Sequence, residues 1–335
     1  MKISASIYSD SSQDLAATIQ ELEAHHIDML HVDCIEKPAV FTDIKKAQEI
    51  SQLPIDLHLI TENPSSFEKL LDETPVDFLT IQYENLNGSQ KLPKAGFNKL
   101  GLALTSNTPI EVFGEFESEC DFVLLMATEP GKSGGVFQKK NFSRIREFRK
   151  LFPSKRIHVD GGVNAEVSFI LRNLGVHCAV SGSYLFTQKS VGSAVLGLKN
   201  GETESHYCVE DFMLGLDETP QVLDSDLSLK SVLSSIENSK MAFTSVVNSQ
   251  GKLKGIVSNA DVRKGLLQNI ENLNQLSAES LINTTPITVN QSFTVTQLLR
   301  FVRNQSIPIN FLPVVNDDGN LVGSITFNDL IKGEA

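Results

Sequence analysis

Several features of secreted, membrane and nucleic-acid-binding proteins are missing from this sequence of 335 residues. Its four cysteines are far apart and form no Cys-x-x-Cys pair, which argues against a disulfide framework or a zinc ribbon and is typical of a reducing compartment. No apolar run is long enough to cross a membrane. The first residues enter a strand pattern without the apolar segment of a signal peptide, so we expect a cytoplasmic protein.

Positive charge is also scarce, because 29 Lys and Arg face 41 Asp and Glu and leave a net charge of −12. This balance argues against nucleic acid or an anionic membrane surface as a partner. An anionic small substrate stays open, since a local site can be positive on an acidic protein. The hydrophobic content of 41% is that of a globular protein, and the length predicts two domains.

Apolar β-type runs alternate with amphipathic segments through residues 1–198. The predicted strands are 2–8, 29–35, 55–60, 78–83, 100–104, 122–127, 157–160 and 179–181. The predicted helices include 14–25, 42–52, 65–72, 109–119, 141–151 and 165–174, with Asp14 and Asn164 as N-caps. Strict alternation implies a parallel sheet, and eight such units predict a small (β/α)₈ TIM barrel, an α/β fold.

Ionisable side chains stand near the ends of three predicted strands. His31 and Asp33 are two residues apart and share one strand face, while His58 and Asp160 lie near the ends of two other strands. Buried unpaired charges are costly, and barrel chemistry sits at the C-terminal strand ends, so we expect these residues to bind one metal ion. Their donor set suits Zn²⁺, Fe²⁺, Mn²⁺ or Co²⁺. A buried polar network without metal is the alternative.

Other polar residues of the predicted strands receive structural interpretations. Asp56 shares a face with His58 but lies toward the bottom of the barrel, where we expect packing or an ion pair. Helix ends or outward strand faces are predicted for His25, His26, His158 and His177.

Several motifs occur in order on the predicted strands and match one family. They are Ile3-Ser-Ala-Ser6, His31-Val-Asp33, Asp56-Leu-His58-Leu, Glu129-Pro130-Gly131…Gly134-Gly135, Asp160-Gly161-Gly162 and Ser181-Gly182-Ser183. In these motifs the chain resembles the ribulose-phosphate 3-epimerase family, over nearly the whole barrel.

The resemblance implies a metal-dependent isomerase that inverts C3 of a ketose phosphate, converting ribulose 5-phosphate to xylulose 5-phosphate through a cis-enediolate. It implies that Asp33 and Asp160 transfer protons on opposite faces of the substrate. It implies one divalent metal ion bound by His31, Asp33, His58 and Asp160. The implied substrate-binding residues are Ser6, Met126, Gly131, Gly134, Gly135, Gly161, Gly162, Gly182 and Ser183.

The pocket wall departs from the family pattern. The stretch after Asp33 is shortened and lacks the family's Met-Asp-Gly, and Ile60 follows where a methionine is usual. Gln82 stands where the fourth strand usually carries a histidine, and the lid over 131–135 lacks the family's aromatic residue. Two alternatives therefore stay open: a different ketose phosphate such as a hexulose 6-phosphate, or a catalytically silent barrel in a nucleotide-sensing regulatory protein.

A tandem repeat follows a polar linker at 199–208. Residues 245–261 align without a gap with 313–329, sharing Val, Asn, Gly, Leu and Asp. Each copy predicts a strand, a glycine turn, a strand and a helix capped by Ser/Thr-x-x-Asp, with a helix before it at 227–236 or 295–302. Such a duplication usually packs as a pseudo-symmetric pair.

Gly255-Ile-Val-Ser258-Asn-Ala-Asp261 and Gly323-Ser-Ile-Thr326-Phe-Asn-Asp329 resemble the signature of a CBS domain pair. The resemblance implies an α+β tandem pair over 209–335, with copies at about 209–270 and 277–333. It also implies that AMP, ADP or ATP binds through Ser258, Asp261, Thr326 and Asp329 and regulates the barrel. Both component folds commonly self-associate, so we expect a homo-oligomer.

Overall fold

The computed structural model describes residues 1–335 except 11, 87–91, 132–133, 201–205, 240 and 328–335. Contacts divide the chain into two compact units, the first over residues 1–203 and the second over 204–327. The domain bounds drawn from the sequence stay a prediction. Within the described ranges, no helix has the length and apolar character that a membrane span requires.

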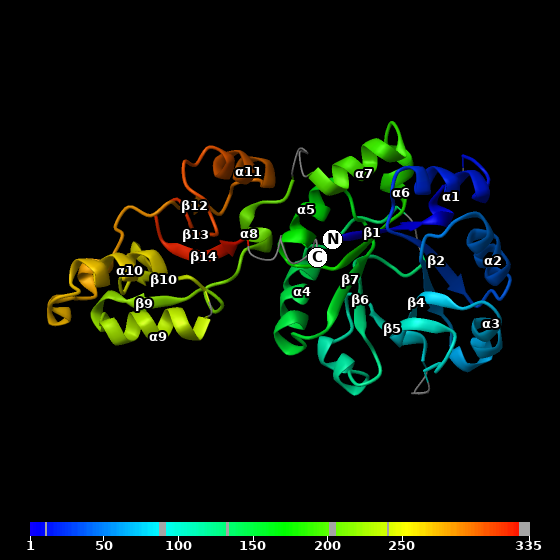
Figure 1. The fold of residues 1–335 in the computed structure, drawn as a ribbon, viewed down its shortest axis with the longest axis horizontal. Helices are drawn as coiled ribbons and strands as arrows, with labels where there is room; N and C mark the ends of the chain where they lie inside the picture. Colours follow the sequence, from blue (N-terminus) through cyan, green and yellow to red (C-terminus); the bar gives the residue numbers. More distant parts are fainter. Residues whose placement is uncertain (11, 87–91, 132–133, 201–205, 240, 328–335) are drawn as a thin grey trace. The chain divides into compact units, whose positions relative to one another are not determined.

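The first unit is a closed barrel of eight parallel strands in sequential order, as predicted (Figure 1). Its strands are β1 (Lys2–Ser6), β2 (Met29–Ile35), β3 (Ile55–Ile60), β4 (Val76–Gln82), β5 (Phe97–Leu104), β6 (Phe122–Met126), β7 (Arg156–Asp160) and β8 (Cys178–Ser181). Its α-helices are α1 (Leu15–Ala24), α2 (Val40–Ile50), α3 (Glu68–Glu73), α4 (Lys140–Leu151), α5 (Ala165–Asn173), α6 (Ser183–Thr187) and α7 (Val191–Asn200). Each predicted strand is confirmed.

Two predicted N-caps fix where barrel helices begin. The Asp14 side chain accepts a hydrogen bond from the Ala17 nitrogen, and Asn164 accepts one from Val167. Behind the strands, α1 buries Ile19 and Leu22 completely. The apolar core therefore lies between the strands and the surrounding helices, as barrel architecture requires.

The connection after β5 differs from the predicted helix over 109–119. It is the 3₁₀-helix η4 (Ile110–Glu115), which contains Gly114, a poor helix former. The Phe113 ring in η4 is fully buried and lies 4.9 Å from Phe148 and 5.1 Å from Phe152 between ring centroids. Aromatic packing therefore holds this short turn against α4. A short helix predicted over 88–97 is wrong in its described part, because 92–96 are not helical and β5 begins at Phe97, while 87–91 lie outside the described residues.

Strand register brings the predicted polar residues to one end of the barrel. On β2 and β3, His31 lies opposite Asp56 and Asp33 opposite His58. Asp160 ends β7. These side chains share the inner face because successive strand residues alternate between the two faces of the sheet.

His158 on β7 corrects one prediction. It lies two residues before Asp160 and therefore shares the strand face of Asp160, which points to the barrel interior and not to the helices. Its ring stacks on Phe122 with centroids 4.1 Å apart and lies 6.0 Å from Phe78. Its role is still structural packing, but within the barrel.

The second unit contains two three-stranded sheets of matching order, so the predicted repeat and its α+β fold are confirmed. The strands are β9 (Gln221–Leu223), β10 (Phe243–Val247), β11 (Leu253–Ser258), β12 (Val289–Asn290), β13 (Phe311–Val315) and β14 (Leu321–Thr326). The helices are α8 (Val209–Phe212), α9 (Leu229–Ser239), α10 (Asn259–Gln268) and α11 (Val295–Arg303).

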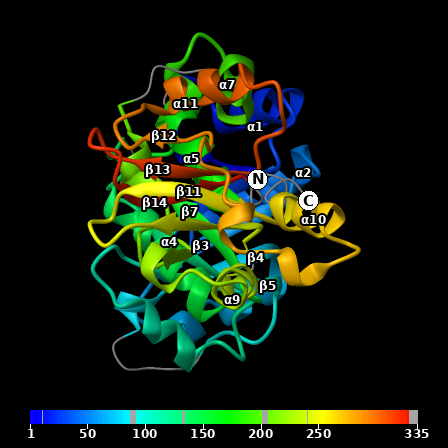
Figure 2. The same ribbon diagram turned by 90° about the vertical axis from the view of Figure 1, so that its left-hand side faces the viewer.

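The hairpins of the two copies contact each other symmetrically (Figure 2). Leu253 donates from its nitrogen to the Gly319 oxygen at 3.2 Å, and Leu321 donates to the Gly251 oxygen at 3.0 Å. Gly251 and Gly319 have positive φ angles of 80° and 77°, as their predicted turn positions require. The duplicated sequence therefore forms a duplicated structure with a pseudo-symmetric interface.

The copies also exchange chain segments. Leu214, which precedes the first copy's sheet, bridges to Ser324 on β14, and Asn283, which precedes the second, bridges to Ile256 on β11. A Cβ built at Gly255 would lie 2.4 Å from the Asn283 oxygen. One glycine of the repeat is thus needed because another backbone approaches it closely.

Candidate active site

The four predicted ligands meet at the C-terminal end of the barrel strands. One donor atom from each of His31, Asp33, His58 and Asp160 can be chosen so that all lie within 4.8 Å of one another. The two histidines are fully buried, whereas the side chain of Asp33 is 21% exposed. The cluster is therefore closed from below by the barrel and accessible on its upper side.

His31 is held by a carboxylate that lies beneath it. Its Nδ1 lies 2.9 Å from Asp56 Oδ2, which also accepts a hydrogen bond from Ser4 Oγ at 2.8 Å. Burial raises the pKa of Asp56, but the charge and hydrogen bond of His31, together with the His158 charge and the Ser4 hydrogen bond, outweigh burial and lower the pKa. Asp56 was predicted to pack or to form an ion pair, and it pairs with His31.

The other nitrogen of His31 has no such partner. His31 Nε2 is buried without a hydrogen bond, and its nearest carboxylate oxygen is Asp33 Oδ1 at 3.4 Å. A buried polar atom without a partner is costly, so this nitrogen fits a position that faces a metal ion. Two imidazoles and two carboxylates are a donor set for borderline divalent cations, and the residues present therefore fit such an ion.

His58, unlike His31, has a hydrogen-bond partner at each of its ring nitrogens. Its Nδ1 lies 3.2 Å from Asp33 Oδ1, and its Nε2 lies 2.8 Å from Gln82 Oε1. The sequence noted Gln82 only as a departure from the family pattern. Its role depends on the register between β3 and β4, which the spacing along one strand does not reveal.

The two candidate catalytic carboxyl groups have opposite pKa directions. Burial raises the pKa of Asp33, but the charge of the neighbouring His31 and the hydrogen bond with His58 together lower it well below its usual range. Burial raises the pKa of Asp160 to about 6; His31 and His58 oppose this rise, whereas the charge of Asp33 adds to it. The two groups thus favour different protonation states in the metal-free protein.

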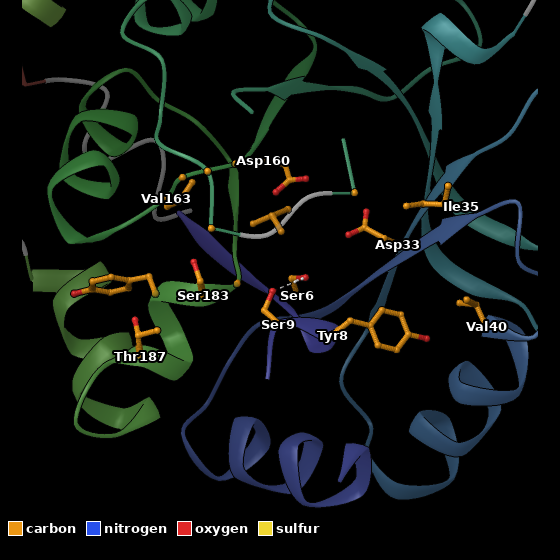
Figure 3. Close-up of a pocket in the computed structure, with 18 of the residues that line it drawn as sticks. Ser6, Tyr8, Ser9, Asp33, Ile35, Val40, Asp160, Val163, Ser183 and Thr187 are labelled. Carbon is orange, nitrogen blue, oxygen red and sulfur yellow. Dashed lines mark hydrogen bonds between the residues drawn. The ribbon is translucent and has the colours of Figure 1, made fainter. Parts of the chain in front are cut away.

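A pocket of about 940 Å³ opens above this cluster, and Asp33 on β2 and Asp160 on β7 both line it (Figure 3). The predicted substrate-binding residues that line it are Ser6, Gly131, Gly134, Gly135, Gly161, Gly162, Gly182 and Ser183. Met126 is not among the lining residues and packs beneath them with Ala103, Leu124 and Val180.

Glycines shape the side of the pocket next to Asp160. Gly161 and Gly162 have φ angles of 108° and 66°, which side chains rarely adopt. A Cβ at Gly162 would lie 2.3 Å from the Phe137 nitrogen, and one at Gly182 would lie 2.3 Å from Ser9 Oγ. Lys132 and Ser133 of the predicted lid lie outside the described residues.

The opposite side of the pocket contains residues that the sequence did not single out. Tyr8, Lys37 and Thr42 line it, and Tyr8 donates from its hydroxyl to Asp43 Oδ2 at 3.0 Å (Figure 3). Tyr8 follows Ser6 by two residues, and that spacing was the only signal available. Lys37 comes from the stretch after Asp33, in which the sequence departs from the family pattern.

In the second unit, the candidate nucleotide residues of the first copy bond to each other. Asp261 Oδ2 accepts hydrogen bonds from the Ser258 nitrogen at 2.8 Å and from Ser258 Oγ at 2.5 Å. This is a capping box that begins α10, as predicted. Thr326 ends β14, whereas Asp329 lies outside the described residues.

Comparison with known proteins gives two family matches. The model of the "Ribulose-phosphate 3 epimerase family" matches residues 2–186, and the model of the "CBS domain" matches 278–334. The ribulose-phosphate 3-epimerase of Helicobacter pylori strain J99 is 31% identical over 216 residues, covering 60% of this chain and 97% of that protein. That of Bacillus subtilis is 26% identical over 216 residues, covering 60% of this chain and all of that protein.

Solved structures of CBS pairs are also similar to the second unit. The CBS-pair protein CBSX2 from Arabidopsis thaliana is 24% identical, with a TM-score of 0.32, and the match covers 38% of this chain and 94% of that one. The same protein has been solved in complex with AMP, with a TM-score of 0.33.

Proposed function

Because this chain belongs to the ribulose-phosphate 3-epimerase family, we propose that it is a metal-dependent epimerase acting at C3 of a ketose phosphate. Ribulose 5-phosphate and xylulose 5-phosphate are the leading substrate pair. The observation that carries this proposal is the pair Asp33 and Asp160, which come from strands β2 and β7 and line one pocket beside two buried histidines.

The two carboxyl groups divide the proton transfer. One, as carboxylate, removes the proton from C3 and leaves the substrate as an enediolate. The other, as carboxylic acid, gives its own proton to the opposite face of C3, so configuration inverts and one proton is exchanged for another. The reverse reaction exchanges the two roles. Asp33 and Asp160 suit this work because they reach the same pocket from two different strands, β2 and β7.

The ion is assigned to His31, Asp33, His58 and Asp160. A divalent cation supplies electrostatic stabilisation of the negative charge that develops on the C2 and C3 oxygens as the proton leaves. His31 and His58 contribute neutral nitrogen donors from rigid strands, which keeps both carboxylates in fixed positions. Barrel strands thus pre-organise the groups on which the reaction depends.

The phosphate end of the substrate is assigned to the glycine side of the pocket. Backbone N–H groups at Gly161, Gly162, Gly182 and Ser183 would bind it, since no Cβ prevents close approach at the three glycines. The C1 end would then lie toward Tyr8 and Lys37. This orientation keeps C3 between the two carboxyl groups.

Solvent deuterium incorporation at C3 of ribulose 5-phosphate, followed by NMR on metal-reconstituted protein, tests the proposal. We expect exchange in the wild type and its loss in both Asp33→Asn and Asp160→Asn. Exchange that survives in both variants would contradict the two-carboxylate mechanism.

The altered wall around Tyr8 and Lys37 favours one second candidate, an epimerase acting on a longer ketose phosphate such as a hexulose 6-phosphate. A panel that compares pentulose and hexulose phosphates at equal concentration distinguishes the two. A higher kcat/KM for the hexulose would replace the leading substrate.

For the C-terminal unit we propose regulation by an adenine nucleotide, AMP, ADP or ATP. The sequence signature around Ser258, Asp261, Thr326 and Asp329 supports it. Calorimetric titration with each nucleotide, followed by the exchange assay with and without it, is the test. Nucleotide binding by a protein that takes up no stoichiometric metal would favour a silent barrel in a regulatory protein.

A further inference from the structure

A series of hydrogen bonds leads to the metal cluster through β4. It begins at Glu84, which follows β4 in the 3₁₀-helix η3 (Tyr83–Asn85). The Glu84 carboxylate accepts hydrogen bonds from the Thr105 nitrogen at 2.8 Å, from the Thr108 hydroxyl and from Gln82 Nε2. Glu84 is therefore surrounded by donors, which suits an ionised carboxylate.

This arrangement fixes the orientation of the Gln82 side-chain amide. A carboxylate can only accept, so the NH₂ group of Gln82 must face Glu84. The same Nε2 also lies 3.4 Å from the Ala103 carbonyl oxygen. If the amide were flipped, its oxygen would face both of these acceptors, and a buried group would lose its hydrogen bonds.

The orientation of Gln82 fixes the tautomer of His58 in turn. Gln82 Oε1 faces His58 Nε2 at 2.8 Å and can only accept, so Nε2 must carry a proton. In a neutral imidazole, the other nitrogen then has a free lone pair. That nitrogen, Nδ1, faces the cluster beside Asp33. The chain of donors and acceptors thus ends in one defined metal-binding atom.

The other histidine has the opposite arrangement. His31 presents Nε2 to the cluster and bonds through Nδ1 to a carboxylate, Asp56. The buried region already contains the carboxyl groups of Asp33, Asp56 and Asp160. A neutral amide at position 82 fixes His58 without placing another negative charge in contact with the cluster.

We propose that Gln82 and Glu84 are positioning residues that fix the His58 tautomer and so select Nδ1 as its metal-binding nitrogen. The inference rests on the proposed metal site, although the tautomer itself does not. Outer hydrogen bonds of this kind typically contribute about 10- to 100-fold to metal affinity. Glu84 also ties the site to Thr105 and Thr108, which follow β5.

The test measures Co²⁺ affinity by competition with a chelator and the visible spectrum of bound Co²⁺, using the full chain. We expect Gln82→Leu to weaken Co²⁺ binding about 10- to 100-fold and to change the spectrum. Glu84→Gln frees the Gln82 amide to flip and should weaken binding less. The double variant Gln82→Glu, Glu84→Gln keeps the hydrogen bond to His58 and the one between the two side chains but loses the donor to Ala103, so it should restore part of the affinity lost in Gln82→Leu.

Thr80→Val is the matched control. Thr80 lies on the same strand, opposite His58, and its buried hydroxyl has no hydrogen-bond partner. The substitution keeps the side-chain shape and should leave both affinity and spectrum unchanged. Equal Co²⁺ affinities for Gln82→Leu and Thr80→Val would overturn the inference while leaving the metal site intact.

NMR of the metal-free protein, with ¹⁵N-labelled histidine, gives an independent readout. We expect Nε2 of His58 to be protonated in the wild type, and its protonation to be reduced in Glu84→Gln. An unprotonated Nε2 in the wild type would overturn the inference. Absence of Co²⁺ binding by the wild type, with the expected tautomer present, would instead contradict the proposed metal site.

Discussion

The barrel and the C-terminal unit both carry aspartates where a strand ends, but these carboxylates have different partners. Asp33 lies beside two buried histidines, 3.4 Å from His31 Nε2 and 3.2 Å from His58 Nδ1. Asp261 accepts its hydrogen bonds from Ser258, only three residues away. The barrel cluster is thus built from side chains on several strands, whereas Asp261 and Ser258 only complete a helix cap.

This difference teaches how the same residue types acquire different roles. The cap is complete without any ligand, because its donors and acceptor satisfy each other. The barrel cluster contains a buried nitrogen without a partner, so binding another group would remove a cost already present. A motif in sequence therefore predicts chemistry better when the fold leaves its atoms unsatisfied.

The largest expected difference comes from removing one charge in each unit. Asp160→Asn should lower C3 exchange about 10²- to 10⁴-fold, the usual contribution of a proton-transferring group, with little loss of stability. Asp261→Asn should instead lower the free energy of unfolding by about 1 kcal/mol, because the cap is weakened. Exchange kinetics and urea unfolding measure both. A comparable loss of stability in both variants would remove the contrast.

The second expected difference concerns the loss of stability at low pH. Burial lowers the pKa of His158 to about 4, whereas an unfolded histidine titrates near about 6.5. Between these values the unfolded chain binds more protons, so the contribution of His158 falls by about 3 kcal/mol as pH decreases from above 6.5 to below 4. Urea unfolding across this pH range should show a smaller loss in His158→Asn. An identical pH dependence in the variant would contradict the assigned environment.

Removing the charge beneath His31 is expected to act on metal affinity. Asp56→Asn keeps the side-chain size but loses the carboxylate, so Co²⁺ should bind about 10- to 100-fold more weakly. Asp121→Asn, which removes an exposed partner of Lys99, is the surface control and should not change affinity. Chelator competition compares the two. Equal affinities would mean that Asp56 only packs.

The smallest expected effect concerns two glycines of the repeat. Gly255→Ala places a methyl group against the backbone of Asn283 and should cost about 2 kcal/mol of unfolding free energy. Gly251→Ala enters open space at a φ of 80° and should cost about 1 kcal/mol. Urea unfolding of both variants provides the comparison. The reverse order would contradict close approach of the exchanged segment.

The strand pattern and the His-x-Asp spacing were sufficient to predict the barrel and its four clustered residues. Both signals lie within single strands, where alternation alone decides which side chains share a face. The partners Asp56 and Gln82 could not be assigned, because their roles depend on register between strands. The helix predicted over 109–119 is a 3₁₀-helix, since packing of Phe113 prevailed over the helical pattern.

The exchanged segments also affect the order in which the chain can fold during synthesis. The barrel strands are complete once β8 has emerged, so that sheet can close while the second unit is still being made. Leu214 must wait for its partner strand β14, which ends more than a hundred residues later. At ribosomal rates of about 5–20 residues per second, this edge stays open for roughly 10 s. In the barrel, β1 likewise waits for β8, since Lys2 pairs with Cys178, so an unpaired strand edge exists in both units during synthesis.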